Sequence, residues 1–86
     1  MIQDTKEYNG YTNFATWDFQ VITNNDYSLY HQVRDIVISN INDEKNVIQS
    51  LRNIASYMND IDSNNVDFEQ VAETWIADIK AELEVE

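Results

Sequence analysis

The sequence predicts an all-α fold, a compact bundle of about four short helices within a single domain over residues 1–86. A chain of 86 residues has the length of one domain with a modest core. It contains no proline and one glycine, whereas β-sandwiches and barrels need many turns rich in both residues. Apolar residues recur every three or four positions along most of the chain, which is the period of a helix buried on one face.

The first helix is expected to follow a flexible lead-in over residues 1–10, because those residues show no apolar period. Thr12 or Asn13 can cap this helix, since a side-chain oxygen accepts a hydrogen bond from a free N–H of the first turn. Phe14 and Trp17 then fall at helical spacing and are expected to anchor the helix in the core.

A strand over residues 16–23 is the alternative for this segment. Trp17, Phe19 and Val21 also alternate with a period of two, as in a half-buried strand. Such a minor β-element would pair residues 18–22 with part of the N-terminus. We favour the helix because no second strand is evident elsewhere in the sequence.

Three further helices are predicted from apolar stripes bounded by polar residues. Each stripe follows a residue that can cap a helix, and Asn, Asp and Ser dominate the connections. The predicted helices cover residues 29–41, 44–59 and 68–83, and their expected caps are Ser28, Asp43 and Asp67.

No residue pattern points to catalysis or to a cofactor. The chain has no cysteine, which excludes disulfides and thiolate zinc sites. His31 is the only histidine and no nucleophile motif accompanies it, so we expect a surface residue. Glu69 and Glu73 lie four apart on one helical face, but a small bundle offers no cleft to raise the pKa of either carboxyl. The prediction is a protein that is not an enzyme and needs no cofactor or metal.

The stretch DIDSNNVDFEQ, residues 60–70, is similar to a calcium-binding EF-hand loop. Asp60, Asp62 and Asn64 occupy the first three positions for oxygen ligands. The loop is one residue short, and the position of the bidentate glutamate falls on Gln70 or Val71. We therefore interpret the stretch as a polar turn with an Asp67 cap, and calorimetry with calcium tests the alternative.

Charge is the strongest global signal in the sequence. Sixteen acidic residues and five basic residues give a net charge of −11. Residues 1–59 have a net charge of −3, whereas residues 60–86 have nine acidic residues, one lysine and a net charge of −8. The basic residues are scattered singly, so no patch for direct nucleic-acid binding is expected. The charge predicts a basic partner, and the alternative is that acidity only maintains solubility.

The acidic residues of the last third are spaced so that a helix can imitate a nucleic-acid backbone. At about 1.5 Å per residue, residues four or five apart stand about 6–7.5 Å apart along the axis, near the spacing of phosphates on one strand. Reversing the charges of Glu69, Glu73 and Asp78 is expected to weaken binding without unfolding the chain. The predicted partner-binding residues are Asp60, Asp62, Asp67, Glu69, Glu73, Asp78 and Glu82.

The segment NGYTNFATWDFQVITNND, residues 9–26, resembles the N-terminal signature of a group of small phage and mobile-element proteins that have no assigned chemistry. Their pattern has the form N-G-[WY]-T-N-[YF]-x-T-W, followed by N-D and Y. Residues 66–76, VDFEQVAETWI, are similar to the closing helix of the same group. The matching residues of the first segment, and of the SLY at residues 28–30 that follows it, are Asn9, Gly10, Tyr11, Thr12, Asn13, Phe14, Thr16, Trp17, Asn25, Asp26 and Tyr30.

The resemblance implies a phage or mobile-element context, which with the acidic charge predicts an inhibitor that mimics nucleic acid. By analogy with anti-CRISPR and anti-restriction proteins, it would block the basic cleft of a host defence nuclease. The alternative is a small helical adaptor or structural module whose apolar patch includes Tyr8, Tyr11 and Phe19. A homodimer is compatible with both hypotheses. No apolar run approaches the ~18 residues of a membrane span, so the bacterial cytoplasm is the expected location.

Overall fold

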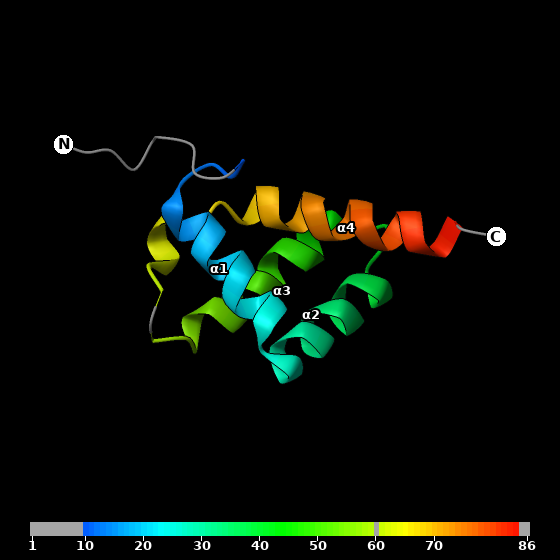
Figure 1. Ribbon diagram of the computed structural model, residues 1–86. Helices are drawn as coiled ribbons and strands as arrows, with labels where there is room; N and C mark the ends of the chain where they lie inside the picture. The colour runs from blue at the N-terminus through cyan, green and yellow to red at the C-terminus, as the bar shows by residue number, and fades with distance from the viewer. Residues whose placement is uncertain (1–9, 60, 85–86) are drawn as a thin grey trace.

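The computed structural model describes residues 10–59 and 61–84, which form an all-α bundle (Figure 1). The longest helix, α4, lies across one side of the bundle and packs against the other three helices. The predicted fold class is therefore confirmed. None of the described helices combines the length and the apolarity that a membrane crossing requires. The elements are α1 (Phe14–Asn25), α2 (Tyr27–Ser39), α3 (Glu44–Ser56), the short 3₁₀ helix η1 (Ser63–Asn65) and α4 (Phe68–Glu84).

Each α-helix begins with a side-chain cap. The cap oxygen accepts a hydrogen bond from the backbone N–H three residues further on, which satisfies one free donor of the first turn. The predicted Ser28 cap is wrong, because Asp26 caps α2 and the helix begins two residues earlier than expected. The four caps are Asn13, Asp26, Asp43 and Asp67.

Helix α1 corrects two expectations. Residues 16–23 are helical, so the strand alternative and a sheet through residues 18–22 are wrong. The β-structure of the described residues consists of an isolated bridge at Tyr11. Phe14 is 52% exposed and Trp17 is half-buried, whereas Phe19 is completely buried. The rotation of α1 agrees with the hydrogen bonds of the buried Thr16 hydroxyl, which turn residue 16 inward and the Phe14 ring toward the surface.

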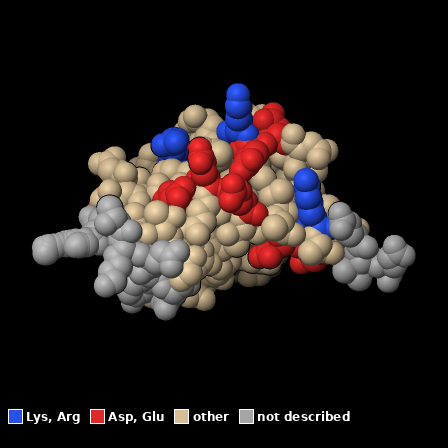
Figure 2. All heavy atoms as spheres, turned by 90° about the horizontal axis from the view of Figure 1, so that it is seen from above, with Lys and Arg blue, Asp and Glu red and all other residues tan. Residues whose placement is uncertain are grey.

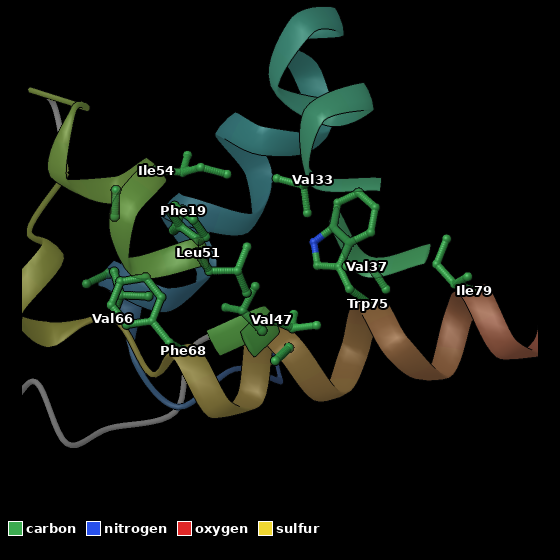
Figure 3. Packing of buried hydrophobic residues seen from close by; sticks show 14 residues of the cluster. Phe19, Val33, Val37, Val47, Leu51, Ile54, Val66, Phe68, Trp75 and Ile79 are labelled. Carbon is green, nitrogen blue, oxygen red and sulfur yellow. The ribbon is translucent and has the colours of Figure 1, made fainter. Parts of the chain in front are cut away.

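The core draws apolar side chains from all four helices (Figure 3). Phe19 and Phe68 meet edge to face with 5.6 Å between ring centroids, so α1 contacts the start of α4. Trp75 lies near Val33 and Ile79, where α4 covers α2 (Figure 3). Leu83 is exposed near the end of α4, where the last turn of the helix extends past α2 (Figure 1).

Candidate functional site

The acidic residues predicted to bind a partner lie in the connection before α4 and along α4 itself. Asp60 lies outside the described residues. A helix turns about 100° per residue, so the nine-residue step from Glu69 to Asp78 amounts to about two and a half turns. The four carboxylates of α4 that belong to the predicted binding set therefore occupy two flanks of the helix. Glu69 and Glu73 face α3, and Asp78 and Glu82 face α2.

The first flank forms an acidic face, defined here as Glu44, Glu69 and Glu73. These residues line a shallow depression of about 290 Å³ together with Lys45. All three glutamates are exposed, and the described structure gives none of their carboxylates an ion pair or hydrogen bond. Figure 2, seen from the side of α4, shows acidic side chains gathered on this surface with basic side chains beside them.

The sequence did not reveal Glu44 as a member of this face, because only the packing of α3 against α4 brings it near Glu69. Glu44 and Glu69 lie in the first turns of their helices, where a negative charge interacts favourably with the helix dipole. Glu73 lies beyond the first turn of α4, so this local effect does not explain its charge.

The second flank of α4 lines a groove of about 500 Å³ between α1, α2 and α4. Glu82 pairs with Arg34 across this groove at 2.7 Å, and this hydrogen bond raises the pKa of the Arg34 guanidinium. The charge of Glu82 is therefore partly compensated within the molecule. The structure gives Asp78 no such partner among the described residues.

Two buried polar atoms lie in the wall of the same groove without a hydrogen-bond partner in the described structure. They are Oε1 of Gln20 and Nε1 of Trp75. A buried polar group left without a partner costs about 1–3 kcal/mol. These two atoms therefore mark the least satisfied part of the described core.

The carboxylate of Asp67 belongs to a hydrogen-bonded network that we name the polar clasp, defined as Thr12, Asn13, Thr16, Asp67 and Gln70. Oγ1 of Thr12 donates to Asp67 at 2.7 Å, and the backbone N–H of Thr12 donates to Oε1 of Gln70 at 2.7 Å. The N–H of Asp67 donates to Oγ1 of Thr16 at 2.8 Å, and that hydroxyl donates to Asn13. Asp67 is thus engaged in joining the N-terminal segment to α4.

Two hydrogen bonds to backbone carbonyls, those of Gly10 and Asn65, extend the clasp. Nε2 of Gln70 donates to the carbonyl of Gly10, whose φ of +88° lies in the region that favours glycine. Nδ2 of Asn13 donates to the carbonyl of Asn65 at 2.8 Å. Nearby, Asp62 accepts from the side chain of Asn65 at 2.6 Å, within the connection before α4. The clasp therefore joins the two segments on which the resemblance to mobile-element proteins rests.

The histidine predicted to be a surface residue lies outside these acidic regions. His31 is exposed, as predicted, and its ring contacts those of Tyr27 and Tyr30 at centroid distances of 4.4 and 5.4 Å. Within residues 10–59 and 61–84, no three acidic or histidine side chains are placed to hold a metal ion.

An apolar groove of about 450 Å³ lies between α2 and α3. The patch expected from Tyr8, Tyr11 and Phe19 is wrong for Phe19, which is buried in the core; Tyr11 is half-buried, and Tyr8 lies outside the described residues. The sequence carried one signal for the groove, the absence of any acidic residue over residues 45–59. Its lining residues are Leu29, Gln32, Ile36, Ser50, Asn53, Ile54, Tyr57 and Met58.

Comparison with known proteins adds no relative, since no family model, curated protein or solved structure matches the chain. The resemblance of residues 9–26 to phage and mobile-element proteins therefore stays a prediction.

Proposed function

We propose that the protein is a non-enzymatic inhibitor whose acidic surface occupies the basic nucleic-acid cleft of a host defence enzyme, such as a CRISPR effector or a restriction complex. The observation that carries the proposal is the acidic face, where two helices bring together three exposed carboxylates that make no ion pair or hydrogen bond among residues 10–59 and 61–84. A carboxylate that already accepts hydrogen bonds within the fold is less available to a partner. The exposed carboxylates of the acidic face can instead pair with arginine and lysine side chains of a partner.

Electrostatics supports a charged partner of this kind. A net charge of −11 attracts a basic cleft over long distances, so association is fast at low salt and slows as salt screens the field. The phage or mobile-element context expected from residues 9–26 provides a reason to block a host nuclease. We do not include Asp67 among the proposed binding residues, because its carboxylate accepts hydrogen bonds within the fold.

Capture from a bacterial host lysate tests the proposal. The immobilised protein is expected to retain basic nucleic-acid enzymes at low salt, and to release them at high salt or when duplex DNA is added, because DNA competes for the same cleft. A Glu69→Lys/Glu73→Lys variant is expected to lose them. The matched control, Asp18→Lys/Asp35→Lys, changes the net charge equally on α1 and α2 and is expected to retain them.

The same capture distinguishes the adaptor alternative. Partners that withstand both high salt and DNA, and that bind the Glu69→Lys/Glu73→Lys variant as well as the wild type, would contradict nucleic-acid mimicry. Such partners would instead indicate an adaptor that binds through apolar contacts.

A further inference from the structure

The groove between α1, α2 and α4 contains the two buried polar atoms that lack a hydrogen-bond partner in the described structure. One is a donor, Nε1 of Trp75, and the other is an acceptor, Oε1 of Gln20. The two residues are only 4% and 6% exposed. A buried polar group without a partner lowers stability and calls for an explanation. A ligand that supplies both hydrogen bonds would provide one.

The charges of this groove favour a cationic ligand. Among the described residues, three charged ones line the groove, Arg34, Asp78 and Glu82, and two of them are acidic. Arg34 pairs with Glu82 at 2.7 Å, whereas Asp78 is exposed and makes no ion pair with a described residue. The groove therefore offers one carboxylate to a positive group. The net charge of −11 attracts such a group and repels an anion.

The aromatic side chains of the groove favour a planar cation. The rings of Tyr30 and Trp75 both line the groove, with 5.4 Å between their centroids. A guanidinium group stacks on aromatic rings and donates in a fork to a carboxylate, whereas the ammonium group of lysine is a compact point charge. The chain's own Arg34 illustrates this fit, because its guanidinium already bonds Glu82 within the groove.

An arginine residue within a peptide offers all of these contacts. Its guanidinium can donate to Asp78 and to Oε1 of Gln20, but it has no acceptor for an indole N–H. A backbone carbonyl of the peptide supplies that acceptor. We propose that the groove binds an arginine residue of a peptide segment, with the guanidinium between Asp78 and Gln20 and a backbone carbonyl at the N–H of Trp75. Because both polar atoms are buried before binding, the peptide has to displace the Gln20 amide, whose terminal torsion is soft.

Titration of the full chain with the tripeptide acetyl-Gly-Arg-Gly amide tests the site. Proton–nitrogen correlation NMR follows the indole N–H groups of the two tryptophans, and Trp17→Phe assigns them. The Trp75 resonance is expected to shift with a Kd of about 1 mM, whereas the resonance of Trp17, which does not line the groove, stays in place. The same peptide with citrulline, an uncharged analogue of arginine, is expected to bind about tenfold more weakly, because it forms no charged pair with Asp78.

Two variants each remove one contact to the peptide. Gln20→Met is expected to stay folded, since it removes a polar atom without a partner in the described structure, and to abolish the shift of the Trp75 resonance. Asp78→Asn is expected to raise the Kd by about tenfold. The matched control is Asp35→Asn, which neutralises an exposed aspartate of α2 outside the groove and is expected to leave the Kd unchanged.

A Trp75 resonance that does not move at about 10 mM arginine peptide would overturn the proposal. Equal Kd values for the arginine and citrulline peptides would overturn it as well, because the groove would then not recognise the charge. So would equal binding by the wild type and Gln20→Met. The titration needs no host protein, so none of these results bears on inhibition through the acidic face.

Discussion

The polar clasp and the acidic face both depend on carboxylates near the start of α4, but they use them in different ways. The Asp67 carboxylate accepts hydrogen bonds from Thr12 Oγ1 and from the N–H of Gln70. Glu69, two residues further along, is exposed and has no such bond in the described structure. The difference teaches that the position of hydrogen-bond donors decides the role of an acidic residue. Asp67 lies beside donors and stabilises the fold, whereas Glu69 lies away from them and contributes surface charge.

The largest effect is expected from breaking the clasp. Asp67→Ala removes the cap of α4 and the 2.7 Å hydrogen bond from the Thr12 hydroxyl, which keeps Oε1 of Gln70 as an acceptor at 3.0 Å, so the free energy of unfolding is expected to fall by about 2 kcal/mol. Urea denaturation followed by circular dichroism measures this loss. A change below about 0.5 kcal/mol would show that the clasp contributes little to the fold.

Thr16→Val is expected to have the next largest effect. The two side chains have similar shape, but valine cannot accept the N–H of Asp67 or donate to Asn13. Leaving that part-buried N–H without this acceptor, and the buried Asn13 carbonyl without this donor, is expected to cost about 1–2 kcal/mol. The measurement is again urea denaturation, with Thr74→Val in α4 as the control, since the Thr74 hydroxyl donates to the carbonyl of Gln70, four residues before it in the same helix. Equal losses in both variants would contradict a special role for Thr16.

Gln20→Met tests the opposite case to the clasp, whose polar atoms are hydrogen-bonded. Oε1 of Gln20 is buried and has no hydrogen-bond partner in the described structure. The substitution keeps the length of the side chain and removes a buried carbonyl oxygen that has no hydrogen-bond partner among the described residues. The thermal midpoint is therefore expected to rise, with a gain in unfolding free energy of up to about 1 kcal/mol. A clear loss of stability would indicate that Gln20 makes a hydrogen bond in solution.

Glu73→Lys is expected to have the smallest effect on stability. The side chain is exposed on α4 and has no internal partner in the described structure, so the unfolding free energy is expected to change by less than about 0.5 kcal/mol. Urea denaturation checks this value. A loss above about 1 kcal/mol would assign Glu73 to the fold and remove the contrast with Asp67.

The sequence predicted the helical fold well because caps and apolar stripes are local signals. Asn13, Asp43 and Asp67 each act on residues three positions away, and the stripes of α3 and α4 repeat regularly. The burial of Phe19 could not be predicted in the same way. It depends on the rotation of α1, which agrees with the hydrogen bond between Thr16 and Asp67, a residue 51 positions away.

The candidate site was predicted only in part for the same reason. Glu69 and Glu73 were expected to act together and do share a face, whereas Glu44 joins them only through the packing of α3 on α4. Spacing along the sequence grouped Asp78 and Glu82 with them, but helical rotation places those two beside α2. Spacing also could not show that Arg34 pairs with Glu82.

The most direct test of the acidic face is the inhibition of a nuclease captured from the host lysate. Cleavage of its nucleic-acid substrate is titrated with the wild type, with Glu69→Lys/Glu73→Lys and with the control Asp18→Lys/Asp35→Lys, each checked for folding by circular dichroism. We expect the wild type and the control to inhibit at the same concentration, and the acidic-face variant to need about tenfold more protein or worse. Equal inhibition by all three folded proteins would contradict a binding role for Glu69 and Glu73.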